Sequence, residues 1–199
     1  MVKRHLFISG PAFSGKSQLI RECLGERMRY AGGFCTELSS APDGGLLGCS
    51  MLPTAMAAGE EGFEKELFID LQKTPVGHDN EVFRHTGVRL LEESLYYPFA
   101  VLDEIGGMDL IIPQFRVSLD ALLVTQLPIL GVVKSLEESE NLRQMLGPGE
   151  RFHEFSLRLH QMLDMNENTE VLRFEGDAAE ACGDAVREWV ETWTAGGWQ

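Results

Sequence analysis

The strongest constraint on the fold is a glycine pattern near the N-terminus, Gly10-x-x-x-x-Gly15-Lys16-Ser17, within the stretch HLFISGPAFSGKSQLI. A short apolar run precedes the pattern. Apolar residues after it recur at helical spacing, namely Leu19, Ile20, Cys23, Leu24 and Met28. The chain is therefore predicted to form a strand, a glycine-rich phosphate-binding loop and a helix in direct succession. An ordinary glycine turn at a helix N-terminus is the alternative, and the flanking strand and helix favour the phosphate loop.

Such a loop binds phosphate because its successive backbone N–H groups surround the anion, assisted by the helix dipole. Lys16 is expected to reach the β- and γ-phosphates of a nucleotide, and Ser17 to place its hydroxyl on Mg²⁺. The residues expected to bind the nucleotide are Gly10, Pro11, Ala12, Phe13, Ser14, Gly15, Lys16, Ser17 and Gln18.

Phe13 is unusual in such a loop, whose interior commonly holds small residues. If this position needs a positive φ angle, the bulky side chain implies a strain of about 1–2 kcal/mol. If it does not, the ring is free to cover the triphosphate or a neighbouring helix. Gly10, Gly15, Lys16 and Ser17 are all present, so the loop is interpreted as one that binds nucleotide despite the unusual residue in its interior.

A second motif is the continuous apolar run Phe99 to Asp103, which is typical of a buried parallel strand. In phosphate-loop enzymes an acid at such a strand end holds Mg²⁺, the role expected for Asp103. Glu104 is then expected to orient and deprotonate the attacking water. Neighbouring residues at a strand end point in different directions, so the two acids can face metal and water separately. Alone this motif is weak, because many strands end in solvated charge.

The rest of the chain alternates apolar runs with helical patterns, which predicts an α/β protein with a mainly parallel central sheet flanked by helices. The Gly-, Pro- and Asp-rich stretch SSAPDGGLLG predicts a turn and a β-hairpin elaboration after the second strand, GGFCTEL. No repeat or linker interrupts the pattern, so residues 1–199 are expected to form a single domain. Longer helices are expected over Gly15–Arg29 and Asn80–Tyr97.

The charge balance limits the partners of the chain. Seventeen Lys and Arg against 31 Asp and Glu give a net charge of −14, which repels nucleic acid and anionic lipid. No nucleic acid or membrane partner is therefore expected. The N-terminal apolar run is too short for a signal peptide, and no stretch reaches the length of a membrane span. The four cysteines form no C-x-x-C pair, so reduced thiols in a cytoplasmic protein are expected rather than a zinc site.

The order of these motifs resembles the THEP1-type (cancer-related) nucleoside-triphosphatases of the P-loop NTPase superfamily. The resemblance rests on the glycine loop, on GGFCTEL and on DEIGGMDL followed by a phenylalanine, and it covers about Phe7 to Val133. It implies a RecA-like parallel sheet and Mg²⁺-dependent hydrolysis of ATP, GTP and other triphosphates with broad base tolerance. It also implies that Lys16, Ser17, Asp103 and Glu104 act as described above.

The chain departs from this family in its positive charges. Gly107 stands where the family commonly has lysine, and GGLLGCS lacks the arginine that often follows the second strand. Lys134, at the end of the predicted strand LPILGVV, is the best remaining transition-state stabiliser, because the carboxyl ends of parallel strands face the ligand. A solvated loop lysine is an equally good interpretation of Lys134. Arg84 and Arg89 are better explained as surface helix charges.

Other candidates carry less weight. His153 and His160 share one side of a predicted helix, yet no further ligand-type residue joins them, so a core-edge or surface position is favoured over metal binding. Trp189 and Trp193 are expected in the core, and Trp198 is a candidate docking residue.

The leading hypothesis is a slow Mg²⁺-dependent nucleoside-triphosphate phosphohydrolase, because no arginine finger is evident in the sequence. One alternative is a nucleotide or nucleoside kinase, although no arginine-rich lid is visible. The other is a nucleotide-binding accessory or regulatory protein with little hydrolysis. The preferred base and the oligomeric state do not follow from the sequence.

Overall fold

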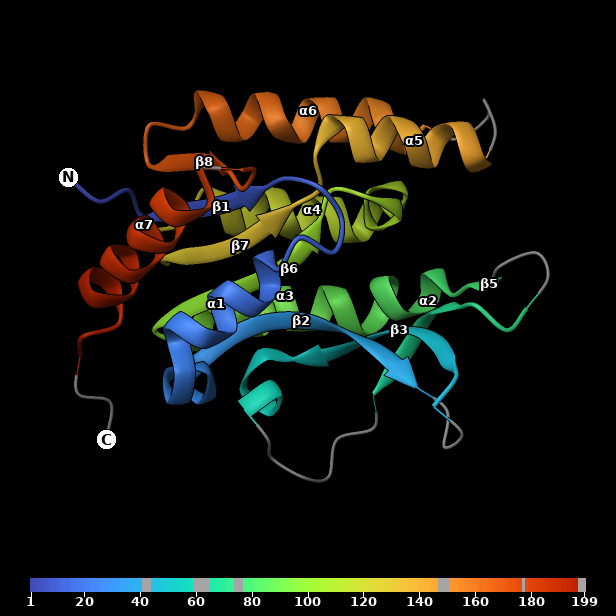
Figure 1. The fold of residues 1–199 in the computed structure, drawn as a ribbon, viewed down its shortest axis with the longest axis horizontal. Coiled ribbons are helices and arrows are strands. Elements are labelled where there is room, and N and C mark those ends of the chain that lie inside the picture. The colour runs from blue at the N-terminus through green and yellow to red at the C-terminus, as the bar shows by residue number, and fades with distance from the viewer. Residues whose placement is uncertain (41–43, 59–64, 74–76, 147–150, 177, 197–199) are drawn as a thin grey trace.

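The computed structural model describes residues 1–40, 44–58, 65–73, 77–146, 151–176 and 178–196. These residues form one eight-stranded sheet in the order β5-β4-β3-β2-β6-β7-β1-β8 (Figure 1). Its strands are β1 (His5–Ser9), β2 (Ala31–Ser40), β3 (Leu46–Pro53), β4 (Glu66–Asp70), β5 (Gly77–His78), β6 (Phe99–Ile105), β7 (Ile129–Val133) and β8 (Thr169–Arg173).

The sheet has a parallel part and an antiparallel part. β2, β6, β7, β1 and β8 pair in parallel, while β2–β3, β3–β4 and β4–β5 pair antiparallel. The prediction of an α/β fold with a mainly parallel sheet and a hairpin after the second strand is confirmed. The tip of that hairpin, residues 41–43, lies outside the described residues, as does Trp198.

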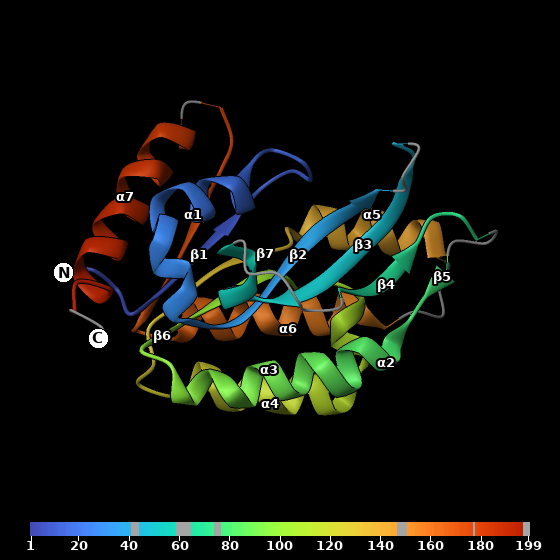
Figure 2. The same cartoon turned by 90° about the horizontal axis from the view of Figure 1, so that it is seen from below.

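Helices cover both faces of the parallel part, as two perpendicular views show (Figure 1, Figure 2). Leu6 and Ile8 of β1 pack with α1 and α7 on one face, whereas Phe7 packs with α3, α4 and α6 on the other. This two-sided burial explains the continuous apolar run of β1. The helices are α1 (Lys16–Leu24), α2 (Asn80–Val82), α3 (Val88–Glu93), α4 (Pro113–Leu123), α5 (Leu136–Leu146), α6 (Phe152–Met165) and α7 (Ala178–Trp193).

The strand order brings three carboxyl ends to one edge of the sheet. β7 lies between β1 and β6, and its Gly131 is opposite both Phe7 and Leu102. A Cβ on Gly131 would lie 2.6 Å from the Leu102 carbonyl oxygen, so only glycine permits this close approach. Ligands of parallel sheets bind beyond the carboxyl ends of the strands. The loop after β1, the acids of β6 and the residue after β7 therefore share one site.

The first predicted helix is shorter than expected. The pattern predicted a helix to about Arg29, but α1 ends at Leu24 and a 3₁₀ turn follows over Gly25–Tyr30. Gly25 adopts φ +50°, a conformation that a helix does not contain and that glycine tolerates. Apolar periodicity runs across this break and therefore does not reveal it.

The second predicted helix, Asn80–Tyr97, is interrupted by a π-helical turn over Phe83–Gly87 and ends in a 3₁₀ turn. Gly87 packs closely against the ring of Phe115, since a Cβ there would lie 3.0 Å from it. The lack of a side chain at Gly87 thus permits the close approach of this segment to α4.

Of the two tryptophans expected in the core, Trp189 is buried there and Trp193 packs only partly buried against it. Trp189 is fully buried and donates a hydrogen bond from Nε1 to the Arg4 carbonyl at 3.0 Å. Trp193 is half-buried, and its Nε1 donates to the Lys3 carbonyl at 3.1 Å. Within the described part of the chain, no helix has the length and apolarity needed to cross a membrane.

Candidate active site

The loop after β1 is shaped by its two framing glycines. A Cβ on Gly10 would lie 2.6 Å from the Phe174 carbonyl oxygen, so a side chain does not fit there. Gly15 precedes α1 with φ +95°, in the region that favours glycine. The loop therefore curls over the N-terminus of α1, where unpaired helical N–H groups and the helix dipole favour an anion.

Lys16 points back into this loop. Its Nζ donates hydrogen bonds to the Gly10 carbonyl at 2.9 Å and to the Pro11 carbonyl, and the residue is 4% exposed. Burial lowers the pKa of Lys16, against the attraction of Glu138 and Glu104. The ammonium is therefore desolvated and held by neutral carbonyls, partners that a phosphate group can replace.

Phe13 adopts φ +58° and is 89% exposed. The sequence left open whether this position has a positive φ angle. It does, so the bulky side chain is expected to cost about 1–2 kcal/mol of backbone strain. Because the ring is almost fully exposed, it does not cover a neighbouring helix.

Asp103 lies in the buried strand β6 and contacts Ser17 of α1. Ser17 Oγ donates to Asp103 Oδ1 at 2.6 Å, across 86 residues of sequence. Thr36 of β2 donates to the other oxygen, Oδ2, from its backbone N at 3.1 Å and from its Oγ1 at 3.2 Å. Asp103 is 2% exposed, and this burial raises its pKa despite the hydrogen bonds. The hydroxyl and the carboxylate predicted for Mg²⁺ are therefore in contact.

Glu104 turns away from this cluster. Its φ of +61° is rare for a residue other than glycine, and its carboxylate accepts a hydrogen bond from Lys134 Nζ at 2.9 Å. Burial raises the pKa of Glu104, but the attraction of Lys134 outweighs it and the net pKa is lowered. Conversely, Glu104 overcomes the burial of Lys134 and raises the pKa of its ammonium. Both groups are therefore charged at neutral pH.

The turn after β6 makes room for Lys134. The buried carboxylate of Asp109 accepts hydrogen bonds from the backbone N of Gly106 at 3.1 Å and of Gly107 at 2.6 Å. A Cβ on Gly107 would lie 3.0 Å from both Cδ and Cε of Lys134. The glycine that replaces the expected family lysine thus leaves space that the stem of Lys134 occupies.

Sequence reasoning missed several residues of this site. Thr36 carried no assigned role, and its contact with Asp103 depends on the parallel pairing of β2 with β6. Arg21 was also missed, although it lies four residues after Ser17 and thus on the same helical face. Its Nη2 donates to the Thr36 carbonyl at 2.7 Å and lies 3.9 Å from Asp103 Oδ2. These groups surround Asp103 with donors.

Other predicted residues lie away from this cluster. The Gln18 side chain is exposed and donates to Glu22 at 2.7 Å, and Arg84 and Arg89 form exposed ion pairs on their own helices. His160 Nε2 lies 2.9 Å from the Lys134 carbonyl oxygen, while His153 Nδ1 lies 3.1 Å from Ser139 Oγ. Among the described residues, no group of three or more His, Cys, Asp or Glu side chains is arranged to hold a metal ion.

A cavity of about 570 Å³ adjoins the loop. This volume is in the range of small-molecule sites. Carboxylates dominate its charged lining, which therefore favours an uncharged part of a ligand over a further phosphate. Its lining includes residues 10–12 of the loop, Ser135, Glu138, Asp164, Arg173 and Glu175.

Comparison with known proteins identifies the family and the fold of the chain. A family model described as NTPase matches residues 5–162. The crystal structure of THEP1 from the hyperthermophile Aquifex aeolicus resembles this fold with a TM-score of 0.61 and 17% sequence identity, covering 94% of this chain and 99% of that one. A search of curated proteins gives no match. Because the family model spans well over half of the sequence, the chain belongs to the THEP1-like NTPase family.

Proposed function

We propose that the chain is a Mg²⁺-dependent nucleoside triphosphatase that hydrolyses the bond between the β- and γ-phosphates. The proposal rests on one observation: the phosphate loop, the Ser17–Asp103 contact and Glu104 meet at a single sheet edge. Such an arrangement offers an anion site, a cation site and a carboxylate near the terminal phosphate. The domain as a whole, residues 1–199, is proposed to act as one unit.

The oxygen groups beside the loop fit Mg²⁺ in their chemistry. Mg²⁺ prefers hard oxygen ligands and is commonly held by one or two protein groups together with phosphates and water. Ser17 Oγ and the Asp103 carboxylate are such groups and already touch at 2.6 Å. The burial that raises the pKa of Asp103 also indicates that its charge needs a cationic partner. Bound there, Mg²⁺ supplies charge that neutralises the β- and γ-phosphate oxygens.

Glu104 is proposed as the group that activates water. Its lowered pKa keeps the carboxylate ionised at neutral pH, so it can accept a hydrogen bond from a water molecule. The water oxygen forms a bond to the γ-phosphorus as the bond to the β–γ bridging oxygen breaks. The water proton passes to Glu104 and the diphosphate leaves. Lys16, released from the loop carbonyls, is expected to bind the β- and γ-phosphates.

Lys134 is proposed to stabilise the charge that develops on the γ-phosphate. Its ammonium is held 2.9 Å from Glu104 and its stem lies over Gly107, next to the proposed water. In the absence of nucleotide it pairs with Glu104, so each turnover must exchange this partner for phosphate oxygen. We therefore expect slow hydrolysis.

We further propose broad base tolerance. The loop recognises phosphates through its backbone and Lys16, groups that are common to ATP, GTP, CTP and UTP. The nucleoside is expected in the adjoining cavity of about 570 Å³. The acidic surface fits a cytoplasmic enzyme with no nucleic acid partner.

Phosphate release from ATP, GTP, CTP and UTP with Mg²⁺ tests this function in the wild type and in Lys16→Ala and Glu104→Gln. We expect Lys16→Ala to weaken both nucleotide binding and rate, and Glu104→Gln to lower mainly the rate. Glu188→Gln, an exposed substitution on α7, is the matched control and should behave as wild type.

Unchanged activity in both site variants would contradict the assignment. Phosphoryl transfer to an added nucleoside without phosphate release would indicate a kinase instead. Tight nucleotide binding without turnover, unchanged by Glu104→Gln, would indicate an accessory protein.

A further inference from the structure

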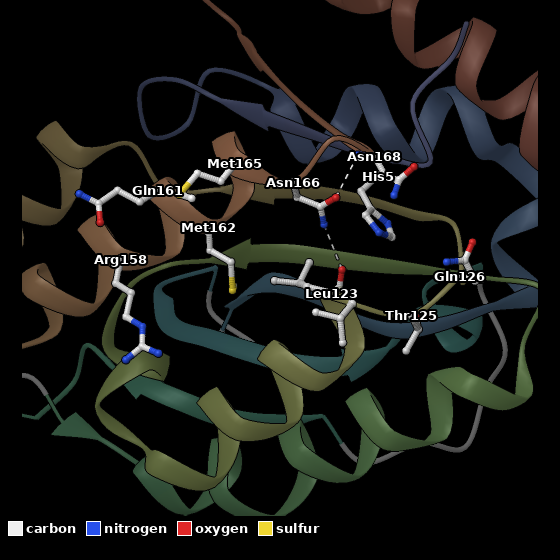
Figure 3. Close-up of a pocket in the computed structure, with 11 residues that line it drawn as sticks. His5, Leu123, Thr125, Gln126, Arg158, Gln161, Met162, Met165, Asn166 and Asn168 are labelled. Atoms are coloured by element: carbon white, nitrogen blue, oxygen red, sulfur yellow. Dashed lines mark hydrogen bonds between the residues drawn. The ribbon is translucent and has the colours of Figure 1, made fainter.

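A second cavity, of about 560 Å³, lies at the opposite edge of the sheet from the phosphate loop. It opens between the C-terminal ends of α4 and α6, beside the first residue of β1 (Figure 3). The proposed reaction uses none of its residues. Its volume is in the range of small-molecule sites.

His5 is a buried polar residue in the lining of this cavity. It is 1% exposed, and its Nδ1 has no hydrogen-bond partner among the described residues. Burial, with a smaller contribution from Arg4, lowers the pKa of His5 to about 4, so the imidazole is neutral at physiological pH. A neutral imidazole carries one donor and one acceptor nitrogen.

A second unpaired atom lies next to His5. Thr169 is its partner in the parallel register of β1 and β8, so the two side chains share one face of the sheet. The Oγ1 of Thr169 is also buried without a partner in the described part of the chain. Buried polar atoms are nearly always hydrogen-bonded in folded proteins, so the unpaired Nδ1 of His5, which lines the cavity, is a candidate contact for a ligand, whereas Thr169 is not a lining residue.

The helix ends beside His5 disfavour an anion at that end of the cavity. α4 and α6 both end here, and helix C-termini carry partial negative charge. Asn166 donates from Nδ2 to the Leu123 carbonyl at 3.3 Å and accepts at Oδ1 from the Asn168 backbone N at 2.9 Å, so it links the two helix ends (Figure 3). Arg158, on α6, lies at the far end from His5 and can stack on a planar group.

The remaining lining combines apolar surface with amides that have both donors and acceptors. Leu123 and Met162 form apolar walls, and no hydrogen bond among the described residues engages the side-chain amides of Gln126 and Gln161. Amide side chains match the paired donor and acceptor edges of nucleobases. Flat apolar faces match their rings.

We propose that this cavity is a second ligand site that binds an uncharged nucleoside, with the polar edge of the base toward His5 and Gln126. This inference rests on the proposed function, which places phosphorylated nucleotides at the opposite edge of the sheet, where the phosphate loop lies; helix C-termini take its place here. The site therefore distinguishes a free nucleoside from a nucleotide, whichever base it carries.

Binding of adenosine, guanosine, cytidine and uridine, measured by calorimetry on the full chain, tests the proposal. We expect at least one nucleoside to bind saturably, both in the wild type and in Lys16→Ala. Its affinity should fall about fivefold in His5→Phe and in Gln126→Ala, the effect of one lost hydrogen bond. Gln144→Ala, an exposed glutamine on α5, is the matched control and should leave the affinity unchanged.

Gln126 is exposed, so its substitution tests the site even if His5→Phe does not fold. Absence of saturable binding for all four nucleosides would overturn the proposal. So would equal affinity in wild type and Gln126→Ala, or displacement of the nucleoside by inorganic tripolyphosphate, which would place it at the phosphate loop.

Discussion

Asp103 and Glu104 are adjacent acids in opposite environments. Asp103 is surrounded by hydroxyl and N–H donors from Ser17 and Thr36, and burial raises its pKa. Glu104 accepts a hydrogen bond from the Lys134 ammonium, and its net pKa is lowered. The pair shows how one strand end supplies two functions, a carboxylate that needs a cation and a carboxylate ready to bind water.

Backbone geometry separates the two acids. The pairing of β6 with β7 is irregular between Leu102 and Ile105, a stretch that holds both acids, and of the two only Glu104 has a positive φ, +61°. A regular strand would also point the two side chains to opposite faces, but it would not turn Glu104 toward the end of β7. The positive φ of Glu104 is therefore expected to be backbone strain that serves the site, because it directs the carboxylate toward Lys134.

The largest expected effect comes from Glu104→Gln. Removal of the base should lower single-turnover hydrolysis about 100- to 1000-fold, within the range of general base catalysis. Nucleotide affinity, measured with a fluorescent analogue, should stay within about threefold, because the loop and the Ser17–Asp103 contact remain. A loss of affinity equal to the loss of rate would remove the distinction between the two acids.

Lys134→Met should lower the rate about 10- to 100-fold. Lys134 also pairs with Glu104 in the resting protein, so the loss should be smaller than for a donor that acts only in the transition state. The variant should also move the acid limb of the rate–pH profile to higher pH. Without the Lys134 ammonium, the burial that raises the pKa of Glu104 is opposed only by the attraction of Lys16, so this pKa should rise from its lowered wild-type value.

Lys73→Met, which removes an exposed lysine paired with Asp70, is the matched control for that profile. It should change neither the rate nor the acid limb. An acid limb at the same pH in wild type and Lys134→Met would show that Glu104 is not the group that titrates.

A smaller effect is expected from Thr36→Val, which removes the Oγ1 hydrogen bond to Asp103 and keeps the backbone N–H bond. Loss of one donor to a buried carboxylate should lower the free energy of unfolding by about 1–2 kcal/mol, seen in thermal unfolding. Thr192→Val, at an exposed position on α7, is the control. An equal loss of unfolding free energy in the two variants would contradict the hydrogen bond between Thr36 and Asp103.

Phe13→Gly should have the smallest effect, a gain of about 0.5–1 kcal/mol in the free energy of unfolding. Relief of the positive φ is partly offset by the greater freedom of glycine in the unfolded chain. Tyr96→Gly removes an aromatic ring that is equally exposed, 88%, but has no positive φ, and should destabilise the fold. Stabilisation in both variants, or in neither, would contradict strain at Phe13.

Local pattern was sufficient to place the main parts of the site. The apolar run that ends at Asp103 and the apolar run before the phosphate loop both predict parallel strands. Because the carboxyl ends of such strands lie at one edge of the sheet, Ser17 and Asp103 were expected to share a site, although 86 residues separate them. The partners of the two acids were not predictable in the same way. Thr36 reaches Asp103 through strand register, and Lys134 reaches Glu104 across Gly107, contacts set by tertiary packing.

The two-residue strand β5 was missed for a related reason. Gly77 and His78 carry no apolar alternation, and their pairing depends on β4 alongside them. The position of Arg21 could have been predicted, since helical spacing from Ser17 already places it on the same face of the helix. Sequence patterns thus predicted the groups expected to contact phosphate, while the groups that tune the acids required the fold.

The central claim is that Asp103 serves the metal and Glu104 serves the water. The most direct test is the Mg²⁺ dependence of phosphate release in wild type, Asp103→Asn and Glu104→Gln. Asp103→Asn should raise the half-saturating Mg²⁺ concentration about tenfold or more, whereas Glu104→Gln should leave it unchanged and lower only the maximal rate. A shift in the half-saturating concentration of equal size in both variants would contradict the separation of the two acids.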